Sequence, residues 1–354
     1  MNWLLIFIPV TLGLEYFAPS RSILVFAASC LAILPLAGWM GEATERLASR
    51  LGEGVGGLLN ATFGNAAELI IALAALRAGL TDVVKASLAG SIIGNILLVL
   101  GAAMLAGGLR HHEQHYNPAG ARAQAAMLTL AAIALVIPAA FRIASGATAE
   151  GLGRLSVAIA IVLILLYAAY LAFALVTHSA LFAGEREAEE TSEAPQSVGR
   201  ALAILTAATI GVAWMSEIMV GAIEPTAHAV GLSKAFVGVF LVAIVGNAAE
   251  HATAIQAALR NRMDLSLSIA IGSSAQVALF VAPVLVLASL FVGPAPMDLA
   301  FPGGLVLMIL LAVLITGQVA GDGRSDWLRG AQLLGVYLVM ALSFFFLPGS
   351  PVAP

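Results

Sequence analysis

Charged residues, cysteine and basic clusters are scarce in this chain, and each scarcity excludes a class of protein. Asp, Glu, Lys and Arg make up only 10% of the 354 residues, whereas soluble domains carry about 25%. A soluble globular domain is therefore excluded. The single cysteine, Cys30, excludes an intramolecular disulfide. The formal net charge is -4 and there is no basic patch, so nucleic acid is not an expected partner.

Long apolar runs fill the chain instead. Hydrophobic residues account for 61% of it, and a helix of about 20 such residues can cross a bilayer. We therefore predict an all-α polytopic membrane protein with the lipid bilayer as its surroundings. The first run lacks a basic leader and an Ala-x-Ala site, so we expect it to be retained. The eleven predicted spans cover residues 2–18, 22–47, 56–79, 83–107, 118–141, 151–178, 199–222, 232–259, 264–291, 298–319 and 328–347.

One five-residue motif occurs twice, letter for letter. The first copy is Gly64-Asn65-Ala66-Ala67-Glu68, and 182 positions later comes Gly246-Asn247-Ala248-Ala249-Glu250. A Gly-Ser pair follows each copy by 26 residues, at Gly90-Ser91 and at Gly272-Ser273. Matched motifs in the same order indicate two related halves.

A third matched pair is Trp39-Met40-Gly41-Glu42 and Trp214-Met215-Ser216-Glu217. After one extra span, each half holds five, and an odd number makes the second half enter the membrane from the opposite side. This inverted repeat is a plan of secondary transporters, whose binding site lies near the bilayer midplane. The expected parts are an N-terminal helix (1–18), a first five-helix repeat (22–178), an acidic linker (184–197) and a second five-helix repeat (199–347).

The acidic linker is the only long hydrophilic stretch, and five of its residues are Glu. It is either a solvated connection between the halves or a short acidic helix that concentrates cations at an entrance. With the N-terminus on side A of the membrane, ten Lys and Arg residues near the loops fall on side A and six on side B. This bias predicts that side A, with the N-terminus and the linker, is cytoplasmic.

Glu68 and Glu250 lie about a dozen residues into their spans, near the middle of the bilayer. A charge there costs at least about 2.5–3.5 kcal/mol, so a proton or a cation must normally neutralise it. The structural alternative is a glutamate kept neutral by a neighbouring helix. The Gly and Asn before each Glu indicate a helix that opens locally, which would turn carbonyl oxygens, including those of Gly64 and Gly246, toward the carboxyl groups.

Two carboxylates with carbonyl and amide oxygens form an all-oxygen site, for which Ca²⁺ is the natural occupant. Mg²⁺ fits less well because it keeps several waters and needs strict octahedral geometry. Zinc would require His or Cys, and only His251 adjoins a motif. Further oxygen donors that could complete the site or hydrogen-bond its ligands are Asn65, Asn95, Asn247, Ser91, Ser273, Ser274 and Gln276.

The same carboxyl groups predict a mechanism, because protons and Ca²⁺ compete for them. If the empty, doubly charged site cannot reorient across the membrane, every reorientation must carry either Ca²⁺ or protons. Such transport is antiport. Glu42, Glu45, Glu217 and Glu224 could extend the path, or lie at helix interfaces. His251, whose counterpart is Leu69, is either a proton relay or a packed neutral side chain. The loop with His111, His112, Glu113 and His115 is either solvated or a regulatory metal site. Gly321-Asp322-Gly323 is expected to form a tight turn.

At these motifs the chain resembles the calcium/proton exchangers of the cation/calcium exchanger superfamily. Residues 90–95 and 272–276 are similar to that family's companion motifs, and the linker is similar to its acidic segment. The resemblance, over residues 30–347, implies eleven helices, a Ca²⁺ site at Glu68 and Glu250, proton-driven Ca²⁺ export, and access switched by polar patches on spans two and seven. A sodium-type Gly-Thr-Ser motif is absent. Ala275 stands where the family often has Thr, so one hydroxyl is missing.

Ca²⁺ and H⁺ are thus the expected transported partners, with no resident cofactor and no enzymatic activity. An exchanger of Na⁺, K⁺ or another divalent ion such as Mn²⁺ stays open. A passive channel is disfavoured by inverted halves, and an intramembrane hydrolase by the lack of His-Glu-x-x-His or a Ser/His pair at one depth. The expected location is the inner (plasma) membrane of a bacterium, as a multi-pass protein. The oligomeric state stays open.

Overall fold

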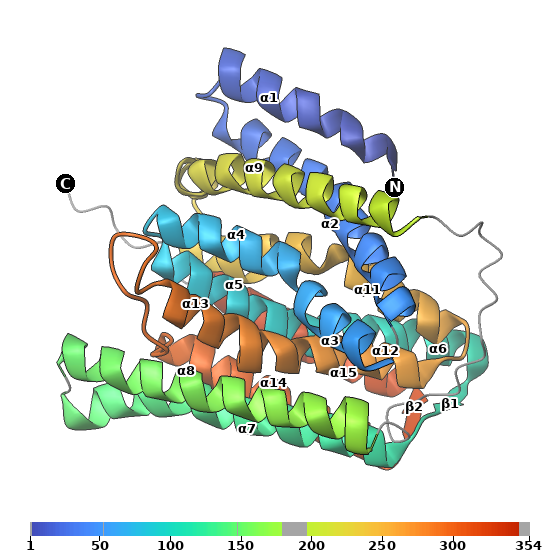
Figure 1. Cartoon of the computed structure of the whole chain (residues 1–354). Helices are drawn as coiled ribbons and strands as arrows, with labels where there is room; N and C mark the ends of the chain where they lie inside the picture. The colour runs from blue at the N-terminus through green and yellow to red at the C-terminus, as the bar shows by residue number, and fades with distance from the viewer. Residues whose placement is uncertain (1, 52, 147, 179–196, 347–354) are drawn as a thin grey trace.

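The computed structural model describes residues 2–51, 53–146, 148–178 and 197–346 (Figure 1). Up to residue 178 its elements are η1 (Asn2–Ile6), α1 (Phe7–Phe17), α2 (Ser22–Leu51), α3 (Glu53–Phe63), α4 (Ala66–Arg77), α5 (Thr81–Ile93), η2 (Gly94–Val99), α6 (Leu100–His111), β1 (Glu113–His115), α7 (Pro118–Ser145), α8 (Ala149–Ala172) and η3 (Phe173–Thr177). The rest comprises α9 (Val198–Val230), α10 (Lys234–Phe236), η5 (Val237–Val242), α11 (Ala243–Leu259), α12 (Met263–Gln276), η6 (Val277–Val281), α13 (Ala282–Ala288), α14 (Gly303–Val319), η7 (Ala320–Asp322), β2 (Arg324–Asp326) and α15 (Trp327–Phe345).

The prediction of an all-α polytopic membrane protein is confirmed. Among the residues that the structure describes, nine helical stretches are long and apolar enough to cross a membrane. The other two predicted spans differ from these nine. Asn2–Phe17 is a shorter apolar helix, and the span predicted over 56–79 is divided into α3 and α4. Residues 184–196 of the predicted linker lie outside the described residues, and Ser197 caps the start of α9 by accepting a hydrogen bond from the Arg200 amide.

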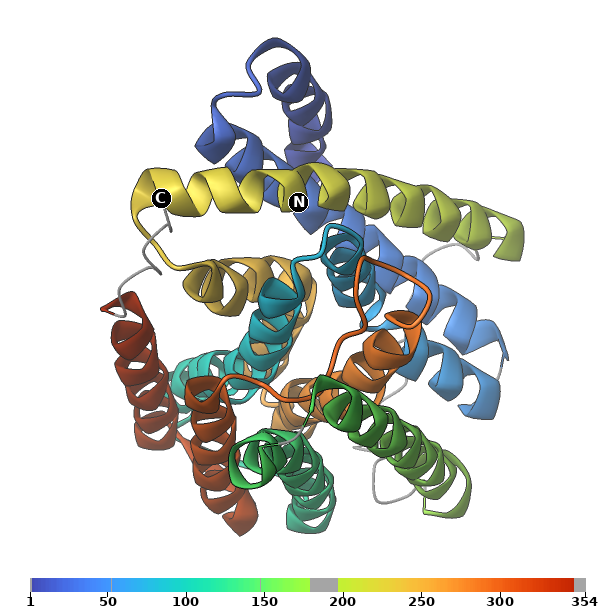
Figure 2. The same cartoon turned by 90° about the vertical axis from the view of Figure 1, so that its left-hand side faces the viewer.

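The helices run between two ends of the bundle (Figure 1). We call the end that holds the N-terminus, β1 and β2 side A, and the end that holds the α4–α5 turn side B. Helices α1, α2 and α9 lie along one flank, and Figures 1 and 2 show them as a layer beside the remaining helices. Within this layer α2 packs on α9, where a Cβ at Gly211 would stand 3.1 Å from the Leu36 side chain.

Glycines let the central helices touch backbone to backbone. A Cβ added at Gly90 of α5 would stand 2.1 Å from the carbonyl oxygen of Val239 in η5. A Cβ at Gly238 would stand 2.7 Å from Cβ of Ala86. Small residues at such crossings are how membrane helices approach closely. The crossing brings Ser91 of α5 beside the helix that carries the second motif.

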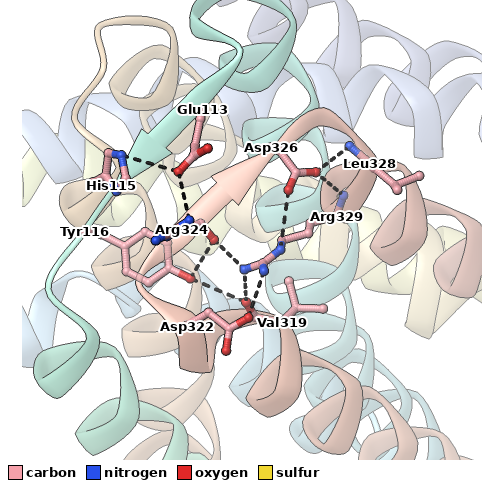
Figure 3. Close-up of polar contacts among 9 residues, drawn as sticks. All are labelled: Glu113, His115, Tyr116, Val319, Asp322, Arg324, Asp326, Leu328 and Arg329. Atoms are coloured by element: carbon pink, nitrogen blue, oxygen red, sulfur yellow. Dashed lines mark hydrogen bonds and ion pairs between the residues drawn. The ribbon is translucent and has the colours of Figure 1, made fainter.

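On side A, strands β1 and β2 form a two-stranded antiparallel sheet that was not predicted (Figure 3). The histidine-rich stretch was expected to be an irregular loop, but Gln114 pairs with Ser325 and leaves His115 opposite Arg324. Arg329 then fills the centre of this region. Its guanidinium donates to the carbonyl oxygens of Arg324 (2.6 Å) and Val319 (3.3 Å) and to Asp322 (2.8 Å). The Arg329 guanidinium thus supplies the positive charge that lies against Asp322.

Tyr116 completes the same region. Burial raises the pKa of its phenol to about 12, so the hydroxyl keeps its proton at neutral pH. It donates to the carbonyl oxygens of Arg324 (3.2 Å) and Val319 (3.4 Å). The expected tight turn follows, as a short 3₁₀ turn that ends in left-handed Gly323, φ 75°. The α6–α7 and α14–α15 connections are thereby held together.

Each motif helix ends in a turn with one residue in the left-handed backbone conformation. A connecting segment from elsewhere in the chain packs on each turn. The turns contain Gly79 (φ 76°) and, 182 positions on, Asn261 (φ 60°). The Gln114 side-chain amide donates to the carbonyl oxygen of Ala258 (2.8 Å) and to Asn261 Oδ1 (3.0 Å). On side B, Pro294 lies 3.0 Å from a Cβ built at Gly79. The matched turns are thus anchored by segments from the other part of the chain.

A buried ion pair holds the α13–α14 connection in the bundle. The ammonium of Lys85, in α5, donates to Asp298 Oδ1 (2.6 Å) and to the carbonyl oxygen of Ala300 (3.1 Å). Asp298 Oδ1 also accepts from the Ala300 amide (2.7 Å). This turn explains why the span predicted from residue 298 begins only at Gly303. Lys85 is 7% exposed and Phe301 is fully buried, so the connection is part of the core.

We predict that Lys85→Met lowers the free energy of unfolding by about 1–3 kcal/mol, because it leaves the Asp298 carboxylate, whose side chain is 30% exposed, without its cation. Asp298→Asn should have a similar effect. The matched control is Arg154→Gln, which breaks an exposed pair with Glu150 inside α8 and should change stability by less than about 1 kcal/mol. Thermal unfolding in detergent measures all three. Equal melting temperatures for Lys85→Met and the control would contradict a role for the buried pair.

Candidate cation site

The first motif lies at a break between two helices. Helix α3 ends at Phe63 and α4 begins at Ala66, so Gly64 and Asn65 stand between them. The predicted opening is therefore present in the first copy. It is wrong for the second copy, because Gly246 and Asn247 lie inside continuous α11.

The two asparagines explain the difference. The Asn247 side-chain amide donates to the carbonyl oxygen of Ala243, four residues earlier in its own helix (2.9 Å). The side chain of Asn65 instead bonds to Gln276 and Ser273 in α12. The Asn247 side chain therefore hydrogen-bonds within its own helix, whereas the Asn65 side chain hydrogen-bonds across the bundle to α12. The irregularity near the second motif comes earlier, in the π-helical turn η5.

Glu68 lies directly on the second motif. Its side chain packs on Gly246, where a Cβ would stand 3.2 Å from Glu68 Cγ and 3.7 Å from Cδ. Glu68 is 8% exposed, and among the described residues neither of its carboxyl oxygens has a hydrogen-bond partner. The same is true of Glu250 Oε2. Such groups are costly to bury unless a proton or a cation joins them.

A chain of side-chain hydrogen bonds connects the motifs. It starts at Gln276, which accepts from the Asn65 amide, and continues to the Ser273 hydroxyl, which donates to Asn65 Oδ1 (3.1 Å). The Asn95 amide donates to Ser273 Oγ (3.3 Å) and to Asn247 Oδ1 (3.2 Å). The Asn247 amide donates in turn to Ser91 Oγ (2.9 Å). Six predicted side chains are thus joined in one network.

His251 attaches to this network at Asn95. Its Nε2 lies 3.1 Å from Asn95 Oδ1. An amide oxygen only accepts hydrogen bonds, so His251 Nε2 carries the hydrogen. The Asn95 amide group is then free to donate to Asn247 and Ser273. His251 therefore fixes which way the Asn95 side chain points, a contact that Leu69 could not make at the matched position.

Asn95 and Gln276 adjoin matched irregularities. Asn95 lies in the π-helical turn η2, and the π-helical turn η6 begins directly after Gln276. The Ser274 hydroxyl has its shorter hydrogen bond to the carbonyl oxygen of Ala270 in its own helix (2.9 Å) and a longer contact with that of Ile92 (3.3 Å). The Thr316 hydroxyl donates to the carbonyl oxygen of Ile96 in η2 (3.4 Å). Ser274, predicted as a possible ligand, therefore bonds to the backbone. Thr316 was not predicted, because a lone Thr in an apolar span carries no motif.

The predicted proton-path carboxylates, other than the central pair, lie away from this network. Glu42 is exposed and pairs with Arg46 on its own helix (3.9 Å). Glu45 is exposed on α2. Glu217 pairs with Arg77 (2.9 Å), and Glu224 pairs with Lys234. Arg77 was not predicted as a site residue, although its place in the last turn of a motif helix is a signal of a possible role.

The centre of the bundle presents two carboxyl groups, amide oxygens and hydroxyls, which are the oxygen ligands that a hard cation prefers. Among the described residues no three His, Cys, Asp or Glu side chains cluster. The fold and this centre define a polytopic membrane protein with an acidic, oxygen-lined site.

Comparison with known proteins identifies the family. The model of the sodium/calcium exchanger protein family matches residues 21–176 and 200–346. A Ca²⁺/H⁺ antiporter of Aphanothece halophytica is 46% identical over 98% of this chain and 96% of its own length. The Ca²⁺/H⁺ antiporter ChaA of Bacillus subtilis is 46% identical over 92% of this chain and 93% of its own. The solved structure of native YfkE superimposes with a TM-score of 0.83 at 43% identity, over 96% of this chain and 97% of that one.

The chain therefore belongs to the sodium/calcium exchanger protein family, and its resemblance to the calcium/proton exchangers is confirmed.

We predict that Gly246→Ala weakens Ca²⁺ binding, because the added methyl group would press on Glu68 Cγ. We expect the affinity to fall about fivefold, which corresponds to about 1 kcal/mol of binding free energy. Gly272→Ala is the matched control, since nothing lies within 4 Å of a Cβ there. Equilibrium ⁴⁵Ca²⁺ binding to the purified variants measures the difference. Equal affinities would show that Glu68 does not bind Ca²⁺ in this position.

Proposed function

We propose that this protein exchanges Ca²⁺ for H⁺ across the membrane, with Glu68 and Glu250 loaded alternately by Ca²⁺ or by protons. The observation that carries the proposal is the Glu68 carboxyl group, which is buried against the other motif with no hydrogen-bond partner among the described residues. The relatives at 46% identity are named Ca²⁺/H⁺ antiporters, which supports the choice of ions.

Each group in the centre has a distinct task. The two carboxyl groups bind Ca²⁺ when deprotonated, and protons discharge them when Ca²⁺ leaves. Gly64, Gly246 and the amide and hydroxyl side chains of the network supply or orient further oxygen atoms. His251 sets the direction of Asn95 through their hydrogen bond. The doubly charged empty site is too costly to reorient within the bilayer. Transport of Ca²⁺ in one direction is therefore coupled to transport of protons in the other.

Alternating access requires helices that move past the site. We assign this motion to α2 and α9, which lie as a flanking layer (Figure 2) and carry the acidic residues Glu42, Glu45, Glu217 and Glu224. The protein acts as a multi-pass transporter in the plasma membrane of a bacterium, with side A in the cytoplasm. No resident cofactor is needed, because the transported ions supply the charge that the site requires.

The test is ⁴⁵Ca²⁺ uptake into proteoliposomes under an imposed pH gradient. Glu68→Gln and Glu250→Gln keep the size of the side chain but remove the charge, so we expect each to reduce gradient-driven uptake to that of empty liposomes. Glu150→Gln, at an exposed position in α8, should leave uptake unchanged. Uptake that follows a Na⁺ or K⁺ gradient instead would show that Na⁺ or K⁺, and not the proton, is the coupling ion. Normal uptake by both central variants would refute the proposed site.

A further inference from the structure

Two ion pairs join distant parts of the chain on side B. Lys85–Asp298 is buried, with side chains 9% and 30% exposed. Arg77–Glu217 is open, with side chains 68% and 57% exposed. A buried pair is strongly destabilising to break, whereas an exposed pair contributes little and parts easily. Only the second is suited to open and close repeatedly.

Arg77–Glu217 connects the site to the flanking layer. Arg77 lies in the last turn of α4, the helix that begins with Glu68 in its first turn. Its Nη1 donates to Glu217 Oε1 at 2.9 Å. Glu217 belongs to α9, 140 residues later in the chain. The pair thus ties the helix of one central glutamate to a helix that must move if access alternates.

The matched position of the second motif helix holds a different kind of residue. Leu259 stands 182 positions after Arg77, so the second motif helix has an apolar residue there. Glu42, the counterpart of Glu217, pairs with Arg46 inside α2. Glu224 pairs with Lys234, but those residues flank one short turn and are connected by the chain in any state. The repeat is therefore asymmetric at the position of Arg77.

Space is present beside the pair. A hollow of about 470 Å³ lies between α1 and α9. It is lined by Leu12, Glu15, Tyr16, Trp214, Glu217 and Ile218. Glu217 therefore borders this open hollow on one side and contacts Arg77 on the other.

We propose that Arg77 is a positioning residue for exchange: its ion pair with Glu217 holds α9 against α4 on side B, and this pair parts and re-forms in every transport cycle. The inference rests on the proposed Ca²⁺/H⁺ exchange. It adds a residue outside the cation site and a contact that distinguishes the two access states.

A reversible cross-link tests the proposal. Arg77 and Glu217 are both replaced by cysteine in a Cys30→Ala background, and the thiols are joined with a reducible bifunctional thiosulfonate about as long as the two original side chains. Glu150→Cys with Arg154→Cys is the control, because that pair lies within α8. ⁴⁵Ca²⁺ uptake under a pH gradient is measured before cross-linking, after it, and after reduction.

We expect the cross-link between α4 and α9 to stop uptake and reduction to restore it, while the control transports throughout. Full uptake by the cross-linked protein would overturn the proposal, since the contact would then be static. That result would not contradict the proposed Ca²⁺/H⁺ exchange. Failure of the unmodified protein to exchange Ca²⁺ for protons would instead refute the proposed function.

Charge variants decide the matter if the cysteine pair is inactive before cross-linking. We expect Arg77→Gln and Glu217→Gln each to change the uptake rate by about two- to fivefold, the range that an exposed pair supports. The double variant should show no further change. The swap of Arg77→Glu with Glu217→Arg should restore the original rate. Independent, multiplicative effects with no rescue by the swap would overturn the proposal.

Discussion

The side chain of Glu68 lies against Gly246 of the second motif, and neither carboxyl oxygen has a hydrogen-bond partner among the described residues. Glu250 leaves one oxygen in the same condition. Buried groups of this kind are stable only when a proton or a cation supplies the missing interaction. The surrounding helices can be understood as a frame that leaves these three carboxyl oxygens without a hydrogen-bond partner among the described residues.

That frame has a tightly connected core and a flanking layer, to which the proposed exchange assigns the movement. Asn65, Asn95, Asn247 and Ser273 use their polar atoms on one another, and Gly90 brings α5 onto the backbone of η5. The Lys85 pair and the β1–β2 sheet secure opposite ends of this core. Helices α2 and α9 lie at its flank, and the long-range contact of α9 through Arg77 is exposed and weak. Stability and movement thus depend on ion pairs of different burial.

The sequence predicted the long helices well, because apolar length is a strong signal in a membrane chain. The exact repeat of five residues also pointed to the side chains that the structure joins, from Asn65 to Gln276. Local patterns could not reveal which asparagine supports its own helix, so the continuous course of α11 through Gly246 was missed. The buried position of Lys85 and the sheet at Gln114 depend on partners about 200 residues away, which no local pattern encodes. Whether the joined residues bind Ca²⁺ stays a prediction.

The most direct test of the shared site is to count protons released when Ca²⁺ binds. A weakly buffered solution of the purified protein with a pH indicator is titrated with Ca²⁺ at a pH where the empty site is protonated. If Glu68 and Glu250 hold either ion, Ca²⁺ binding releases protons, and Glu68→Gln or Glu250→Gln reduces that release. Ca²⁺ binding by the unmodified protein without any proton release would contradict the central claim.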